Sequence, residues 1–181
     1  MWLKEKQGAS IDVINVGNQS SEPTLRKALA IGADKAIRIN SDPNDGFFVA
    51  KQISEYIKNN TYDLIIAGRE SIDYNGAMVP GLIAGFLNIN YVTNCIKLEI
   101  DNENVLLDRE IDGGKETLKG KLPLIIGGQK GLVEESDLRI PNMRGIMQAR
   151  QKPLEVIEPY DFNSNTETLK FQKPLPKQAV K

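Results

Sequence analysis

The sequence predicts an α/β protein with three layers, in which helices cover both faces of a parallel sheet and an antiparallel meander is added to it. Two observations lead to this prediction. Short apolar runs alternate with segments of helical periodicity in the first half of the chain, as in successive strand–helix units. Strand-like segments then follow one another directly, separated by the turn sequences DNEN and DGG, which is typical of a meander.

Three strand–helix units are expected in the first half. The segment SIDVINVG at 10–17 is a nearly continuous apolar run, typical of a strand covered on both faces. Pro23 fits the first turn of the following helix, and Gly32 fits its left-handed C-cap. The second unit is KAIRI at 35–39 with a helix that ends at Asn59-Asn60. The third is DLIIA at 63–67 with the apolar helix after it, and right-handed crossovers are the default connections.

The chain divides into three parts by composition. Residues 1–131 are expected to form the α/β domain with its meander, and residues 132–159 a loop with a short helix at 142–150. Residues 160–181 are polar, and we expect an extended tail with little core of its own. The opening WLKEK looks like the end of an amphipathic crossover helix, so we expect a preceding strand to be missing.

The charge balance and the residue counts exclude several functions. Lysine and arginine number 23 against 24 acidic residues, so the basic excess of a non-specific nucleic-acid binder is absent. With no histidine and one cysteine, Cys95, the chain cannot form a His-based triad, an internal disulfide or most zinc sites. No apolar run approaches the roughly 20 residues that span a bilayer. The N-terminus has no signal-peptide pattern, so we expect a cytoplasmic protein without membrane insertion.

The stretch DLIIAGRESIDYNGAMVPGLIAGFLN at 63–88 is the first candidate site. A buried strand leads into a polar loop, and ligands of open α/β sheets bind at the carboxyl ends of such strands. The loop then enters a helix, whose first N–H groups favour phosphate. Because no GxGxxG or GxxxxGK[ST] motif is present, a nucleotide site and a plain strand–helix connection fit these residues equally well.

Two further segments each allow two interpretations. Arg109 and Glu110 end a strand before the DGG turn, where exposed hairpin charges are the ordinary interpretation. The segment RIPNMRGIMQARQKP at 139–153 is either a short amphipathic helix or a protein-binding surface, because methionine suits adaptable binding surfaces.

Four segments, in their order along the chain, resemble one family. They are TLRKALAIGADKAIRI, DLIIAGRESIDYNGAMVPGLIAGFL, LLDREIDGGKETLKGKLPLII and IPNMRGIMQARQKPLEVI. Together they are similar to the beta (small) subunit of electron transfer flavoprotein, from about Trp2 to Pro159. The resemblance implies an adenine-nucleotide-binding, Rossmann-like fold and a non-enzymatic electron carrier that works between flavin dehydrogenases and a respiratory acceptor.

The resemblance also implies cofactors and partners. The partner is the alpha subunit, which forms a heterodimer with this chain and carries most of the FAD site. This chain would hold a structural AMP, or a second FAD in electron-bifurcating members. Acyl-CoA dehydrogenases or other flavin dehydrogenases are the implied electron donors.

Site residues follow from the same resemblance. The nucleotide is expected to contact the end of the strand at 10–17 and the loop after the strand at 63–67, at Val16, Gly68, Arg69, Glu70, Ser71, Ile72, Asp73, Tyr74, Asn75, Gly76, Ala77, Met78 and Val79. Arg109 and Glu110 are expected to face the alpha subunit near its flavin. Partner recognition is expected from Ile140, Pro141, Asn142, Met143, Arg144, Ile146 and Met147, with Met143 at the position of the family's anchoring leucine.

The chain departs from the family at several points. Its loop has fewer side-chain donors and acceptors than the better-known members, so we expect backbone N–H groups to contribute more. Gln148 and Gln151 stand where some relatives have methylated lysines. The family's first strand and the C-terminal segment that wraps the partner are expected to be missing. The alternative function is a stand-alone adenine-nucleotide-binding protein of the stress-protein or nucleotide-hydrolase class.

Overall fold

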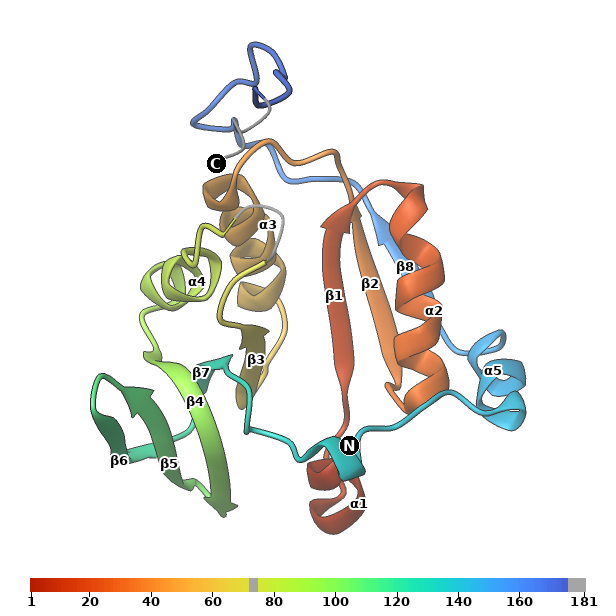
Figure 1. The fold of residues 1–181 in the computed structure, drawn as a ribbon. Coiled ribbons are helices and arrows are strands. Elements are labelled where there is room, and N and C mark those ends of the chain that lie inside the picture. The colour runs from red at the N-terminus through yellow and green to blue at the C-terminus, as the bar shows by residue number, and fades with distance from the viewer. Residues whose placement is uncertain (72–74, 176–181) are drawn as a thin grey trace, which may run out of the picture.

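The structure is a computed structural model that describes residues 1–71 and 75–175 (Figure 1). The first half contains α1 (Trp2–Gln7), β1 (Asp12–Gly17), α2 (Glu22–Ile31), β2 (Lys35–Asn40), α3 (Gly46–Lys58), β3 (Leu64–Gly68) and α4 (Val79–Leu87). The second half contains β4 (Asn90–Asp101), β5 (Asn104–Ile111), β6 (Gly114–Lys121), β7 (Leu124–Gly128), α5 (Met143–Ala149) and β8 (Leu154–Ile157). Short 3-10 turns lie at Gln19–Ser21 and Glu135–Asp137.

The described strands form two sheets, where the sequence analysis expected one. The first sheet has the order β1-β2-β8 and is parallel throughout, and the second has the order β3-β7-β4-β5-β6. In the second sheet β3, β7 and β4 are parallel, whereas β5 and β6 form the antiparallel meander. The α/β class, the parallel strands and the meander are therefore confirmed, and the prediction of a single sheet is wrong.

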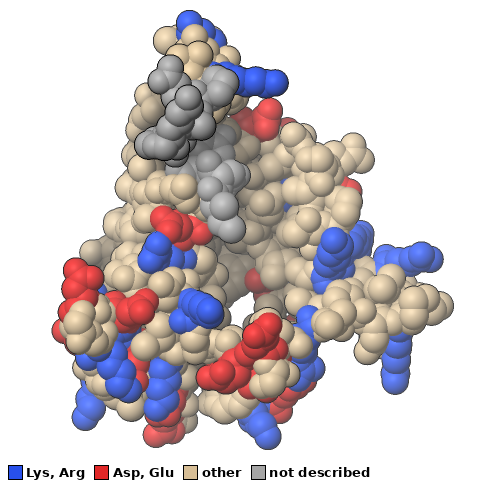
Figure 2. Space-filling view, in the orientation of Figure 1, with Lys and Arg blue, Asp and Glu red and all other residues tan. Residues whose placement is uncertain are grey.

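The division falls between β1 and β3, which face one another across a cavity (Figure 1). The cavity has a volume of about 1030 Å³, and its lining includes Ile11, Val13, Leu64 and Ile66. Ile66 keeps 58% of its surface exposed, and Figure 2 shows the molecule hollowed between its two sheet-bearing parts. The apolar runs of β1 and β3 look like those of central strands, so local sequence could not reveal that each is an edge.

Helix α3 joins the two sheets by packing against both. Phe48 and Tyr56 lie in one core cluster with Ile37 and Ile39 of β2. On another side of the helix, Ala50 packs in a cluster that includes Ile125 of β7. A polar contact adds to this connection, because the Tyr62 hydroxyl before β3 donates to Asp12 of β1 at 2.8 Å. Burial, and then the hydrogen bond to Asp12, raises the pKa of Tyr62.

Strand β8 is an element that the sequence analysis did not predict. It pairs in parallel with β2, with Leu154 opposite Ala36 and Ile157 opposite Ile39. The chain then crosses α3, where the Gln52 amide bonds both the N–H and the C=O of Tyr160 at 2.7 Å. Pairing between segments more than 100 residues apart leaves no local pattern, which explains why the strand was missed.

The tail is attached to the α/β body only over its first part. The backbone N–H groups of Asn165 and Thr166 donate to Asp45 at 2.6 and 2.9 Å. Beyond this attachment the large apolar side chains are almost fully exposed, at 87% for Leu169 and 94% for Phe171. Within residues 160–175, the part of the tail that the structure describes, the apolar side chains beyond Thr166 thus add little to the core.

Candidate functional site

The carboxyl ends of the parallel strands are the first candidate site. β1 ends at Gly17 and β3 ends at Gly68. Val16, which the resemblance assigned to nucleotide contact, is 7% exposed and packs in the core beneath this edge. Next to it, Asn15 Oδ1 is buried and has no hydrogen-bond partner among the described residues. An acceptor in that state is available to a ligand that brings a donor.

The described end of the loop between Gly68 and Val79 contains two residues in the left-handed region. Asn75 and Ala77 both have φ values of 48°. Asparagine adopts this region readily, whereas for alanine it costs about 1–2 kcal/mol. The N–H of Asn75 donates to the Ser71 carbonyl at 2.8 Å. The predicted contacts Ile72, Asp73 and Tyr74 lie outside the described residues. Strain of this kind is commonly held at ligand sites.

The first turn of α4 ends this loop, and no side chain caps it among the described residues. The N-cap position is Met78, and Pro80 lies in the first turn. The N–H groups at such a helix start need partners, and together with the helix dipole they favour an anion. Met78 also lies close to the start of α3, because a Cβ on Gly46 would be 3.0 Å from Met78 Cγ.

Arg69 is already occupied by protein partners. Its guanidinium forms an ion pair with Glu70, and its backbone N–H donates to the Gly128 carbonyl at 3.1 Å. The hydrogen bond to Glu70 raises the pKa of Arg69, with a smaller contribution from the charge of Glu110. An anion bound at this loop would therefore be held chiefly by backbone N–H groups.

Glu110 lies near the start of this loop and is held by residues that the sequence analysis missed. Gln129, directly after β7, donates from its amide to Glu110 Oε2 at 3.0 Å. Asn94 donates to the backbone carbonyl of Glu110 at 3.4 Å. Arg109 instead donates to Glu116 of β6 at 2.6 Å. A glutamine directly after a strand and an asparagine inside a strand give no sequence signal of their own.

Asp108, directly before Arg109, connects the two strands of the β5–β6 hairpin. Asp108 is 7% exposed and accepts from Thr117 at 2.7 Å and from Lys115 at 2.9 Å. These two contacts lower the pKa of Asp108. The carboxylate thus stays charged and orders β5 against β6, next to Arg109 and Glu110.

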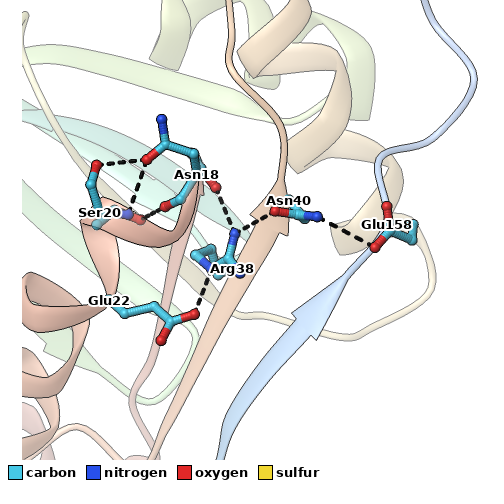
Figure 3. A network of polar contacts seen from close by, with 8 residues as sticks. Asn18, Ser20, Glu22, Arg38, Asn40 and Glu158 are labelled. Carbon is cyan, nitrogen blue, oxygen red and sulfur yellow. Dashed lines mark hydrogen bonds and ion pairs between the residues drawn. The ribbon is translucent and has the colours of Figure 1, made fainter.

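A buried arginine ties together the carboxyl ends of the first sheet (Figure 3). Arg38 of β2 is 5% exposed and donates to Glu22 at 3.1 Å, to the Gly17 carbonyl at 3.0 Å and to Asn40 at 2.7 Å. Asn40 reaches Glu158 beyond β8 at 3.4 Å. The network thus links β1, β2, the segment directly after β8 and the start of α2 at this edge. The single arginine in KAIRI was not singled out from the sequence.

The predicted recognition residues lie on a separate surface around α5 (Figure 1). Most of the apolar side chains there are exposed, at 87% for Ile140, 74% for Met143 and 64% for Met147. Asn142 caps the helix by accepting from the Gly145 N–H at 2.8 Å. In Figure 1 this surface flanks α2 and is remote from the start of α4. The structure therefore brings Glu110 near the loop that begins at Gly68 and keeps the α5 surface apart from both.

These features define a class of protein, an α/β protein with a candidate anion site at its strand ends and an exposed apolar surface elsewhere. A family model described as "Electron transfer flavoprotein domain" matches residues 2–162. The chain belongs to this electron transfer flavoprotein family, which confirms the resemblance that its motifs indicated.

Individual relatives agree with the family match. The chain is 37% identical over 169 residues to the electron transfer flavoprotein subunit beta of Bacillus subtilis (strain 168), covering 91% of this chain and 65% of the relative. It is 34% identical over 183 residues to that of Dictyostelium discoideum, covering 98% and 72%. It is 32% identical over 166 residues to that of Homo sapiens, covering 88% and 64%. The chain thus spans about two thirds of the length of these relatives.

None of the helices in the described ranges is long and apolar enough to cross a membrane.

Proposed function

We propose that this chain acts as the beta subunit of an electron transfer flavoprotein. The observation that carries the proposal is the match to proteins of that name along 88 to 98% of this chain. In this role the chain catalyses no reaction of its own. It completes the FAD site of an alpha subunit, and the pair carries electrons from flavin dehydrogenases to a respiratory acceptor.

The strand-end loop is the proposed site of an AMP or a second FAD in a Rossmann-like fold. The described residues fit such a group in three ways. The start of α4 has no side-chain cap, the left-handed φ values at Asn75 and Ala77 turn the backbone there, and Asn15 Oδ1 has no partner. Phosphate would be held by backbone N–H groups, because the Arg69 guanidinium is paired with Glu70.

Glu110 and Arg109 are the proposed contacts with the alpha subunit. The FAD held by that subunit would supply the redox chemistry. On this chain, Gln129 holds the Glu110 carboxylate in place, and Glu116 holds the Arg109 guanidinium. Charges that are already oriented stabilise a partner at little further cost in conformational entropy.

The exposed apolar surface around α5 is the proposed docking site for the electron donor. Ile140, Met143 and Met147 are mostly exposed, and methionine adapts its shape to different partners. Transient electron-transfer complexes use small interfaces of this kind. One central apolar side chain then contributes a large share of the affinity, and we assign that role to Met143.

The experiment co-produces the chain with an electron transfer flavoprotein alpha subunit. The expected product is a yellow heterodimer that contains one adenine nucleotide per beta chain in addition to the FAD of the alpha subunit. A purified acyl-CoA dehydrogenase with its substrate should reduce the flavin. A colourless monomer that hydrolyses ATP would instead support the stand-alone nucleotide-binding alternative.

The variant Met143→Ala tests the docking surface. It should lower kcat/KM for reduction by the dehydrogenase about tenfold and leave the FAD content unchanged. Val156→Ala is the matched control, because Val156 is an exposed apolar residue of β8 outside the docking surface, and it should behave as the wild type. Equal loss of reduction and of FAD in Met143→Ala would show misfolding and remove Met143 from the proposed role.

A further inference from the structure

Helix α5 is too short to be stable without contacts to the rest of the protein. It has seven residues, Met143–Ala149, and isolated helices shorter than about 12 residues are marginal in water. It is fixed by packing on α2. Ala149 is 3% exposed and lies in a core cluster with Leu25 and Leu29 of α2.

Two cations, one from α2 and one from the segment after α5, connect these two parts of the chain. Arg26 of α2 donates to the Ala149 carbonyl at 2.7 Å and to the Lys152 carbonyl at 2.8 Å. In return, Lys152 donates to the Leu29 and Ala33 carbonyls at 3.0 and 2.5 Å. Arg26 thereby satisfies the carbonyl of Ala149, the last residue of α5, which has no partner within its own helix. Lys152 places its charge near the C-terminal end of α2, where the helix dipole is negative.

The inner side of α5 fits closely against the end of α2. A Cβ on Gly145 would overlap the Ala30 carbonyl oxygen, so the two backbones approach as only glycine allows. Among the described residues, neither Arg26 nor Lys152 forms an ion pair with a carboxylate within 4.0 Å. Their hydrogen bonds go to backbone carbonyls instead. The side of α5 that faces away from α2 exposes Met143 and Met147 to solvent.

We infer that Arg26 and Lys152 are positioning residues that hold the α5 docking surface in its binding conformation. The inference rests on the proposed function of that surface. Neither cation belongs to the exposed apolar set that would touch a dehydrogenase. Their effect comes through the helix, because a surface held in its bound geometry avoids the entropy cost of ordering when the partner arrives. Their loss should therefore weaken association and leave the electron-transfer step itself unchanged.

The test uses Arg26→Met and Lys152→Met in the heterodimer with the alpha subunit. Methionine keeps the aliphatic length and removes the donors. Lys27→Met is the matched control, because Lys27 is the exposed neighbour of Arg26 on the same helix. Two quantities are measured, namely amide hydrogen exchange over residues 143–149, and KM and kcat for reduction by a purified acyl-CoA dehydrogenase.

For Arg26→Met and Lys152→Met, exchange over 143–149 should be faster and KM about tenfold higher, with kcat and FAD content within twofold of the wild type. Lys27→Met should match the wild type in every measurement. If both variants exchange at the wild-type rate, Arg26 and Lys152 do not hold α5 in place, and this clamp on the helix does not exist. If exchange is faster but KM is unchanged, the two residues do not act as positioning residues for docking. If the wild-type heterodimer is not reduced by the dehydrogenase, the proposed docking function fails, whereas the exchange data still decide whether the clamp exists.

Discussion

Asp45 stabilises two separate segments, so its removal has a calculable effect. Its Oδ1 accepts from the Phe48 N–H at 2.7 Å and caps α3. Its Oδ2 accepts from the N–H groups of Asn165 and Thr166 and from the Thr166 hydroxyl at 3.2 Å. One carboxylate therefore starts the helix that joins the two sheets and also attaches the tail.

The substitution Asp45→Ala should lower the free energy of unfolding by about 1–2 kcal/mol. Loss of the N-cap accounts for about 1 kcal/mol of this. The tail contacts add less, because hydrogen bonds to a charged group are worth about 1.5–3 kcal/mol while ordering each exposed tail residue costs about 1–2 kcal/mol.

The effect should also depend on pH. Burial raises the pKa of Asp45, but the hydrogen bonds from Phe48, Thr166 and Asn165 outweigh burial and lower it overall. A carboxyl group with a lowered pKa in the folded state stabilises the protein above its unfolded pKa of about 4, and this contribution is lost as pH falls through the folded value. The difference between wild type and Asp45→Ala should therefore be full at pH 7 and shrink below pH 4.

The assay is urea unfolding at pH 7 and pH 3, with amide exchange of Asn165 and Thr166 as a second measurement. Asp42→Ala is the matched control, because Asp42 is an exposed acid of the same loop and should change neither quantity. A difference between Asp45→Ala and wild type of less than about 0.3 kcal/mol at pH 7, or an equal difference at pH 3, would contradict the assigned role of Asp45.

Three further predictions concern the core, the cavity between β1 and β3 and the strand ends, and urea unfolding measures all three. Ile126→Ala, at a fully buried position of β7, should lower the free energy of unfolding by about 2–5 kcal/mol. Ile66→Thr should lower it by less than about 1 kcal/mol, because Ile66 already borders the cavity between β1 and β3. A large loss of stability in Ile66→Thr would mean that this cavity is closed in solution. Arg38→Met should cost about 2 kcal/mol, because it leaves the Gly17 carbonyl and Asn40 without their buried donor, and a neutral result would show that this network is not needed.

Much of the local structure follows from the sequence. The strand-like runs at 10–17, 35–39 and 63–67 became β1, β2 and β3, because strands of parallel sheets are rich in apolar side chains. Turn sequences also separated the meander strands correctly. For the candidate site, the residues alone left a nucleotide site and a plain connection equally open, and the assignment that the family motifs gave stays a prediction.

Contacts between distant segments were decided only by the tertiary structure. Local sequence gave no signal for the cavity between β1 and β3 or for the pairing of β8 with β2. It also gave none for the hydrogen bond from Gln129 to Glu110, or for the hydrogen bonds by which Arg26 and Lys152 connect α2 with the α5 segment. The physical reason is that periodicity reports how one segment buries its own side chains. Which edge it faces, and which distant donor meets which carbonyl, depends on how the whole chain packs.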